Sequence, residues 1–251
     1  MLQIKDVRVS FGGLIAVKDM NMNVKKGTIH SLIGPNGAGK TTLFNAITRV
    51  IQPDKGDVIF KSESLINLTP EKIIYKGISR TFQNLQLFQG MNVYDNIYSG
   101  FVHNYKGNLF EIFSKKKRDF DIQTKNKILE VTELLQIKNR LNSYPSQLPY
   151  GVLKRVEIAR AMVSDPELLL FDEPAAGLNH NETSEIRDII KMLKSNGKTI
   201  LLVEHDMNLV MKVSDEITVM SFGEKIAEGV PEEIANNEEV IKVYLGESEN
   251  A

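Results

Sequence analysis

The sequence of 251 residues contains no cysteine and no tryptophan, and it contains histidine only four times. The lack of cysteine excludes disulfides and thiolate metal sites, which suits a reducing compartment. The four histidines are scattered and show no spacing typical of metal ligands. The formal net charge of −1 gives no general reason to expect binding to nucleic acid. Composition therefore excludes a disulfide-stabilised protein and gives no support to a nucleic-acid partner.

Long uncharged apolar runs are also missing. None approaches the length needed to span a membrane, and the N-terminal residues Met1 to Asp6 lack the apolar core of a signal peptide. We therefore expect a soluble chain, for which any membrane role must come through a partner. A chain of 251 residues can form one large domain or two small ones around a substantial core.

The most informative stretch is rich in glycine and runs from Gly34 to Thr42. It follows an apolar run typical of a buried strand, Thr28–Ile33, and it leads into a helix start. This order is the context of a phosphate-binding P-loop. Backbone N–H groups and the helix N-terminus would surround an anion, while Lys40 would reach the β- and γ-phosphates and Thr41 would bind Mg²⁺. A glycine-rich turn without a ligand is the weaker alternative. The predicted contacts in this loop are Gly34, Pro35, Asn36, Gly37, Ala38, Gly39, Lys40, Thr41 and Thr42.

Alternating apolar residues before the P-loop predict three strands, at residues 2–9, 14–17 and 20–24. We expect them to form an antiparallel sheet joined to an α/β core. Phe11 lies between the first two strands. By itself it fits a core aromatic, but an aromatic just upstream of a P-loop can also stack on a nucleotide base.

After the P-loop helix, Asp57–Phe60 predicts a strand. Thr69 and the following proline predict a short helix, which Gly77 would end. Ile78–Gln83 then predicts a strand ending at the glutamine. The amide of Gln83 fits an ordinary polar strand end, or a bridge between Mg²⁺ and a water molecule.

Residues 84–166 have a different character and predict a mostly helical subdomain. A helix start is expected at residues 92–97, and Phe101–Phe113 is aromatic and irregular. The basic run Lys115–Arg118 most often indicates a solvated surface, while contact with lipid headgroups is the minority interpretation. The loop from Leu148 to Gly151 opens a helix and is a second, weaker candidate for an anion site. It has no evident use within its own subunit.

Two apolar stretches with polar ends complete the candidate site. Leu168–Phe171 predicts a buried parallel strand, so Asp172 and Glu173 would lie at the edge where ligands bind in α/β sheets. Asp172 suits the Mg²⁺ shell, and Glu173 can orient or deprotonate water. A solvated acidic turn is the weaker alternative. Thr199–His205 predicts another such strand, whose histidine fits a core residue or a donor to a γ-phosphate.

In this order, these motifs resemble an ATP-binding-cassette (ABC) transporter ATPase over essentially the whole chain. Within that family, the chain is most similar to the ATPase subunits of branched-chain amino acid importers, in their larger type. The residues that support this are Arg80-Thr81-Phe82-Gln83, Asp172-Glu173-Pro174-Ala175-Ala176-Gly177-Leu178-Asn179, Val203-Glu204-His205-Asp206-Met207 and Tyr244-Leu245-Gly246-Glu247.

The resemblance implies ATP and Mg²⁺ as ligands and assigns a role to each matching residue. Glu173, His205 and Gln83 would be catalytic, and Thr41, Gln83 and Asp172 would face the metal. Phe11 would stack on adenine. The signature loop, residues 148–152, would face ATP held by an opposite subunit, although Pro149 and Val152 replace its usual serine and glutamine. The nucleotide contacts outside the P-loop would be Phe11, Val17, Leu148, Tyr150, Gly151, Asp172 and Asn179.

The resemblance also implies an architecture and partners. We expect one α/β cassette, with a mixed sheet core and antiparallel β subdomain from residues 1–83 and 167–251 and a helical subdomain from residues 84–166. The expected partners are transmembrane permease subunits, a second ABC ATPase and, indirectly, an external solute-binding protein. The chain would be peripheral on the cytoplasmic face of the membrane. The alternatives are a urea or amide importer, a cassette protein outside transport and, more distantly, a P-loop kinase.

Overall fold

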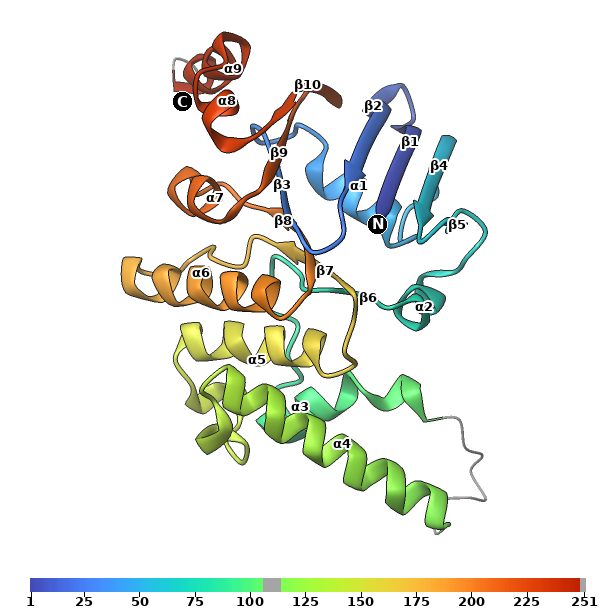
Figure 1. The fold of residues 1–251 in the computed structure, drawn as a ribbon, viewed down its shortest axis with the longest axis vertical. Helices are drawn as coiled ribbons and strands as arrows, with labels where there is room; N and C mark the ends of the chain where they lie inside the picture. Colours follow the sequence, from blue (N-terminus) through green and yellow to red (C-terminus); the bar gives the residue numbers. More distant parts are fainter. Residues whose placement is uncertain (106–113, 249–251) are drawn as a thin grey trace.

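The computed structural model describes the backbone of residues 1–105 and 114–248 and the side chains up to Tyr244. Two sheets occupy one end of the elongated molecule, and a group of helices occupies the other (Figure 1). A four-stranded antiparallel sheet has the order β2-β1-β4-β5, and a six-stranded sheet has the order β10-β9-β3-β8-β7-β6. The predicted α/β class, with an antiparallel N-terminal sheet and a parallel core, is confirmed.

The strands are β1 (Leu2–Phe11), β2 (Leu14–Val24), β3 (Ile29–Ile33), β4 (Lys55–Phe60), β5 (Glu63–Ser64), β6 (Ile78–Arg80), β7 (Leu168–Asp172), β8 (Thr199–Val203), β9 (Glu216–Ser221) and β10 (Glu224–Gly229). The helices are α1 (Lys40–Ile47), α2 (Pro70–Ile73), α3 (Val93–Ser99), α4 (Lys115–Leu134), α5 (Tyr150–Met162), α6 (His180–Ser195), α7 (Met207–Val213), α8 (Pro231–Ala235) and α9 (Glu238–Ser248). Short 3₁₀ turns lie at Ile74–Lys76, Val102–Asn104, Lys138–Arg140 and Pro145–Gln147.

The centre of the six-stranded sheet is buried on both faces. Every residue of β3, β7 and β8 is buried, and these strands run parallel to one another and to β6 and β9. Most of their residues are apolar, because helices or another sheet cover both faces of such strands. Parallel strands place their carboxyl ends at one edge, so the residues that follow β3, β6, β7 and β8 meet there.

Two strand predictions need correction. Residues 14–24 form one continuous strand rather than two, because register shifts let β1 and β2 stay paired through positive φ angles at Asp6 (50°) and Asp19 (44°). Strand β6 ends at Arg80, before Gln83. The ladder ends there because the N–H of Asp172 in β7 donates to the side-chain hydroxyl of Thr81 at 3.3 Å instead of to its carbonyl, while the N–H of Phe82 donates to the Glu157 side chain of α5 at 3.2 Å.

Helices α3, α4 and α5 pack together beyond the six-stranded sheet. The predicted helix start is confirmed, because the side chain of Asn92 caps α3. The basic run opens α4, with Lys115, Lys116 and Arg118 exposed. Lys117 is half-buried and bonds to Tyr98 and Asp121, so part of this run packs on the helices rather than facing solvent. The predicted irregular segment lies partly outside the described residues, at 106–113.

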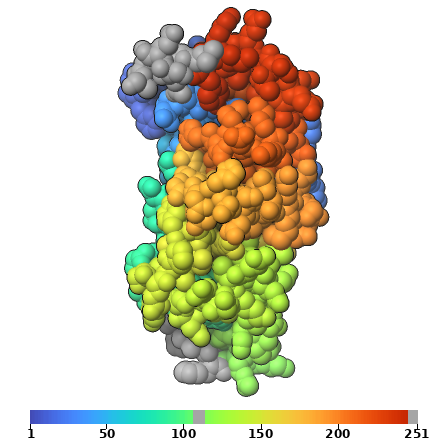
Figure 2. Space-filling model, turned by 90° about the vertical axis from the view of Figure 1, so that its left-hand side faces the viewer, coloured from blue at the N-terminus to red at the C-terminus, as the bar shows by residue number. Residues whose placement is uncertain are grey.

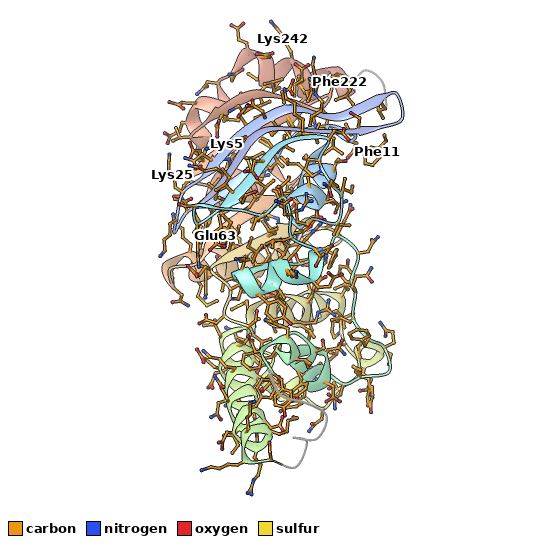
Figure 3. The ribbon with its side chains drawn as sticks, turned by 90° about the vertical axis from the view of Figure 1, so that its right-hand side faces the viewer. Lys5, Phe11, Lys25, Glu63, Phe222 and Lys242 are labelled. Atoms are coloured by element: carbon orange, nitrogen blue, oxygen red, sulfur yellow. The ribbon has the colours of Figure 1, made fainter. Side chains whose placement is uncertain are left out.

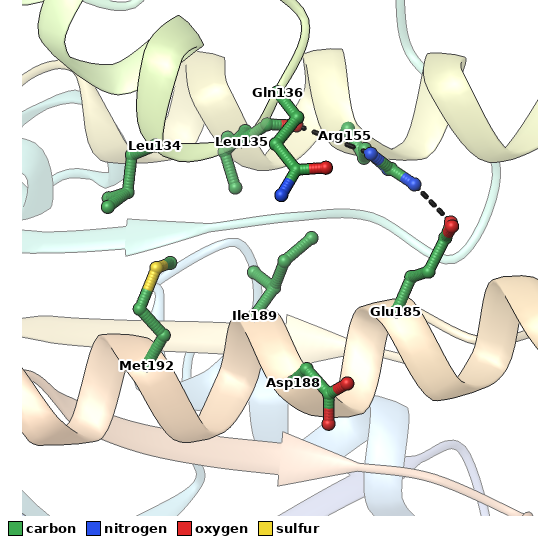
Figure 4. Close-up of a pocket in the computed structure, with 8 residues that line it drawn as sticks. All are labelled: Leu134, Leu135, Gln136, Arg155, Glu185, Asp188, Ile189 and Met192. Carbon is green, nitrogen blue, oxygen red and sulfur yellow. Dashed lines mark hydrogen bonds and ion pairs between the residues drawn. The ribbon is translucent and has the colours of Figure 1, made fainter.

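The helical group joins the sheet core through α5 and α6. Arg155 of α5 donates to the carbonyl of Leu135 at 3.5 Å and forms an ion pair with Glu185 of α6 (Figure 4). Figure 2 shows the outer face, where α6, α7 and the C-terminal helices lie above α4 and α5. Within the described residues, no helix combines the length and apolar character that crossing a membrane requires.

Candidate functional site

The glycine-rich loop between β3 and α1 is packed closely against backbone. Gly34 and Gly39 have φ angles of 148° and 100°, which favour glycine. A Cβ on Gly34 would lie 2.0 Å from the carbonyl oxygen of Met220, and one on Gly39 would lie 2.2 Å from that of Ala16. The loop therefore needs glycine at both positions for packing as well as for its turn.

Lys40 occupies the first turn of α1 and is only 6% exposed. Its ammonium donates to the carbonyl oxygens of Gly34 and Pro35 at 2.6 and 2.8 Å. The next residue, Thr41, is exposed. The loop therefore combines a lysine charge, a helix N-terminus and an accessible hydroxyl, which are the groups that bind phosphate. Of the other predicted contacts, Asn36 and Gly37 are exposed, Pro35 and Thr42 half-buried and Ala38 buried.

Glu173 brings the three predicted catalytic residues together. Its two carboxylate oxygens accept hydrogen bonds from Gln83 Nε2 at 2.7 Å and from His205 Nε2 at 2.8 Å. Glu173 itself is 8% exposed and has a φ of 49°, in the region where strained residues often mark functional sites. The side chain of His205 is 41% exposed, so the alternative of a buried core histidine is wrong.

Asp172 lies beside Glu173 but is held differently. Its Oδ2 forms an ion pair with Arg80 Nη2 at 2.7 Å, and both side chains are buried. Its Oδ1 is buried and has no hydrogen-bond partner among the described residues. A buried carboxylate oxygen without a partner costs free energy unless a ligand satisfies it. No sequence pattern pointed to this function of Arg80, because an arginine in a short strand looks like any other solvated charge.

Glu204 is another residue that sequence reasoning missed. It is 3% exposed, and its carboxylate accepts backbone N–H groups from Ala175 at 2.8 Å and His205 at 3.1 Å. It therefore ties the segment after β7 to the segment after β8. Burial raises the pKa of this carboxyl, although the backbone hydrogen bonds oppose that effect.

Two charged residues of α5 reach the segment that carries Gln83. Lys154 Nζ donates to the carbonyl oxygen of Gln83 at 3.2 Å, and Glu157 accepts the N–H of Phe82. Both side chains are buried, and burial raises the pKa of Glu157. These contacts could have been suspected from the sequence, because a lysine and a glutamate lie among the apolar residues of one helix and buried charges need partners.

The loop that opens α5 contacts α6 and the segment before it. A Cβ on Gly151 would lie 2.6 Å from Glu182 Oε1, and one on Gly177 would lie 3.3 Å from the ring of Tyr150. The loop therefore packs on its own chain, and its contact with ATP held by an opposite subunit stays a prediction. Leu148 packs against the helical core, whereas Pro149 and Tyr150 are exposed.

Asn179 has a clear structural function. Its side chain accepts the N–H groups of Asn181 and Glu182 at 3.0 and 3.1 Å, while Glu182 accepts the N–H of Asn179. This reciprocal arrangement is a capping box at the start of α6. Any contact of Asn179 with nucleotide would have to coexist with this cap.

The two predicted base contacts have different surroundings. Phe11 is 49% exposed at the end of β1, so the core-aromatic alternative is wrong, whereas Val17 is completely buried in the core. A second aromatic that the sequence did not reveal, Phe222, is 91% exposed at the same end of the molecule (Figure 3). The next residue, Gly223, donates its N–H to the carbonyl oxygen of Ala38 in the P-loop at 3.0 Å.

Comparison with known proteins agrees with this geometry. Residues 17–176 match the family described as "ABC transporter", and residues 224–250 match "Branched-chain amino acid ATP-binding cassette transporter". The chain is 41% identical to the high-affinity branched-chain amino acid transport ATP-binding protein LivG of Escherichia coli K12, over 99% of this chain and 98% of that protein. It is 40% identical to BraF of Pseudomonas aeruginosa, a protein of the same description, with the same coverage.

Solved structures show the same likeness. A nucleotide-free ATP-binding cassette from an ABC transporter superposes with a TM-score of 0.86 at 32% identity, covering 97% of this chain and 98% of that chain. A dimeric cassette in a post-hydrolysis state, bound to ADP and Pi, gives a TM-score of 0.77 at 27% identity, covering 92% of this chain and 99% of that chain.

Proposed function

This chain belongs to the ABC transporter family of ATP-binding proteins, and we propose that it hydrolyses ATP to power a branched-chain amino acid importer. The observation that supports this most is the bonding of Gln83 and His205 to Glu173, at the same edge of the sheet as the P-loop. A buried carboxylate with two oriented partners is suited to act as a general base toward water. The similarity to LivG and BraF, including the match at residues 224–250, supports branched-chain amino acids as the solute.

In the proposed mechanism, the P-loop amides and Lys40 hold the β- and γ-phosphates of ATP. Glu173 polarises the attacking water, and His205 contacts the γ-phosphate. The same geometry has a further consequence for His205: its Nε2 must carry a proton to donate to the carboxylate of Glu173.

The residues present fit a magnesium ion. Asp172 Oδ1 is a buried acceptor without a partner among the described residues. Thr41 and Gln83 are exposed residues whose side chains carry oxygens that can ligate a metal. Mg²⁺ usually takes only one or two protein carboxylates together with substrate phosphates. When bound, it would neutralise charge that develops on the phosphates. Thr41, Gln83 and Asp172 are the residues proposed to hold it.

A second cassette would complete the site. The proposed contacts from this chain to a partner's ATP are Leu148, Tyr150, Gly151 and Asn179, while Phe11 stacks on the adenine of its own ATP. Pro149 offers neither a hydroxyl nor an N–H, so any phosphate contact here comes from the amides that follow it. The dimeric relative bound to ADP and Pi supports this assembly. The partner would be a second ABC ATPase in the complex, and a homodimer in isolation is the alternative.

The proposed membrane partner is a permease, which would hold this chain on the cytoplasmic face of the membrane. An open groove lined mostly by apolar side chains, among them Val50, Ile74 and Phe82, lies next to Arg80. Such a surface suits a short amphipathic helix of a membrane protein. A solute-binding protein would act on the permease and touch this chain only indirectly. A urea or amide importer, or a cassette outside transport, is the alternative function.

The test is reconstitution of the chain with its permease and partner ATPase in proteoliposomes. We expect ATP-dependent leucine uptake when the solute-binding protein is present, and no uptake with the Lys40→Ala variant. Uptake of urea or an amide in place of leucine would change the solute. Failure of any membrane protein to copurify with the chain would contradict a role in transport.

A further inference from the structure

We propose that Arg80 is a positioning residue that fixes the carboxylate of Asp172 so that its second oxygen faces magnesium-bound ATP. The proposal rests on the proposed function of Asp172 at the magnesium site. Arg80 itself would touch neither the nucleotide nor the metal.

The arginine is anchored on both sides of its guanidinium. Nη2 pairs with Asp172 Oδ2 at 2.7 Å, and Nη1 donates to Asn45 Oδ1 at 2.7 Å and to Thr48 Oγ1 at 3.3 Å. The side chains of Arg80 and Asp172 are 7% and 3% exposed. A planar guanidinium held at two corners has little freedom to rotate. Arg80 therefore links α1, which starts at the P-loop, directly to the end of β7.

Two aromatic rings limit the guanidinium further. Its Cζ lies 5.4 Å from the centroid of the Phe44 ring and 5.0 Å from that of Phe82. Both distances fall within the range of cation–π attraction. Phe44 is completely buried in the core, whereas Phe82 is 43% exposed. The position of Arg80 is thus determined by four neighbours apart from the carboxylate that it holds.

The two carboxylate oxygens of Asp172 have different surroundings. Arg80 occupies Oδ2, while Oδ1 is buried and has no partner within the residues that the structure describes. If Arg80 only neutralised a buried charge, the favourable arrangement would be the two-pronged pair, in which both oxygens accept from the guanidinium. Instead Nη1 donates to Asn45, Nε is buried without a partner among the described residues, and Oδ1 of Asp172 stays available. This one-sided bond is what a positioning residue requires, because groups that orient metal ligands affect metal affinity strongly.

The experiment measures how much Mg²⁺ strengthens ATP binding. Isothermal titration of the purified chain with ATP, in EDTA and in excess Mg²⁺, gives that gain for the parent, Arg80→Lys, Asn45→Ala and Asp172→Asn. We expect Arg80→Lys to bind ATP normally in EDTA but to lose about tenfold or more of the gain, since lysine keeps the charge but not the planar fork. Asn45→Ala keeps the ion pair and removes an anchor, so it should lose a smaller part.

The outcomes test the role of Arg80 separately from the assignment of Asp172 to magnesium. A parent-like gain in Arg80→Lys would show that Arg80 is only a structural counter-ion. If Arg80→Lys does not show the cooperative thermal unfolding of the parent, Asn45→Ala decides, and a parent-like gain there would overturn the proposal. If Asp172→Asn keeps the full gain, the assignment of Asp172 to magnesium fails, whatever Arg80 does.

Discussion

The P-loop and the loop that opens α5 both contain glycine and both lead into a helix, but their surroundings differ. Gly34 and Gly39 have left-handed backbone and press against carbonyl oxygens of the same chain. Gly151 has ordinary helical backbone and faces a side chain, Glu182, while Pro149 and Tyr150 beside it are exposed. The first loop is completed within its own chain, and the second presents its surface outward.

The helix caps make the same distinction. Among helices of seven residues or more whose N-cap the structure describes, side chains cap α3, α4, α6, α7 and α9. The N-caps of α1 and α5, Gly39 and Pro149, make no such hydrogen bond. Free N–H groups at a helix start need solvent, a cap or an anion. The two uncapped helices are those that follow the two loops proposed to contact phosphate, one in this chain and one across the dimer.

The largest effect is expected at the sheet edge, in Glu173→Gln. The substitution keeps the shape but removes the negative charge, so general-base assistance is lost, and hydrolysis should fall by about 10²–10⁴-fold. ATP affinity should stay close to that of the parent. Phosphate release in a single turnover, measured alongside ATP affinity, checks this prediction. Lys40→Ala is the matched contrast, because it should weaken nucleotide binding itself. Near-normal hydrolysis in Glu173→Gln would remove Glu173 from the mechanism.

The second prediction tests the outward-facing loop through Pro149→Asp. An aspartate at this exposed N-cap should cap α5, which typically adds about 0.5–2 kcal/mol to stability. It should also repel a partner's γ-phosphate, weakening ATP-driven association by about thirtyfold, or ~2 kcal/mol. The measurement is association with the partner ATPase in a Glu173→Gln background, with ATP affinity of the single chain as the internal reference.

Pro149→Ser is the control for that experiment, because it restores the usual residue of the family without adding charge. It should associate at least as well as the parent. Unchanged association in Pro149→Asp would mean that the start of α5 does not face phosphate. Gly151→Asp would be a poorer probe, because the new carboxylate would crowd Glu182 of the same chain.

The gathering of Gln83, Glu173 and His205 could be predicted because it follows from local patterns. Each follows an apolar strand of a parallel sheet, or lies shortly beyond it, and such strand ends meet at one edge. The contacts of Arg80 and Gly151 could not be predicted in this way. Arg80 meets Asp172 and Asn45, which are 92 and 35 residues away in the sequence. Only the complete fold brings such partners together.

The burial of side chains near the site was a second limit of the sequence. Phe11 and Val17 belong to neighbouring strands, and both are apolar. Phe11 lies at the end of the hairpin and is half exposed, whereas Val17 faces the core and is buried. Alternation predicts which residues share a face, but it does not say which face a second sheet or the P-loop will cover.

A smaller effect is expected for the proposed contact between Phe11 and the adenine base. Phe11→Ala should weaken ATP binding toward the lower end of about 1–3 kcal/mol, because the ring is already half exposed. Binding of inorganic tripolyphosphate, which has no base, should not change. Phe222→Ala is the matched control for the other exposed aromatic at this end of the molecule. If Phe11→Ala binds ATP as the parent does, Phe11 does not stack on adenine, and a loss in Phe222→Ala alone would move that role to Phe222.

The smallest effect compares a buried carboxyl from each region, Glu157 on α5 and Glu204 at the sheet edge. Burial raises the pKa of both above their ordinary value of 4.5. The folded chain therefore binds more protons than the unfolded chain between 4.5 and the raised pKa, so stability falls as pH rises through that window. Glu157→Gln and Glu204→Gln lack this fall, and each should gain stability relative to the parent as pH increases.

Thermal unfolding from pH 4 to pH 8 measures the difference, and a change of about 1 kcal/mol shifts Tm by about 2–4 °C in a chain of this length. Because the two carboxyls bond to different segments, the gains should add in the double variant. A difference in Tm that stays constant with pH would show that neither proton equilibrium is coupled to folding.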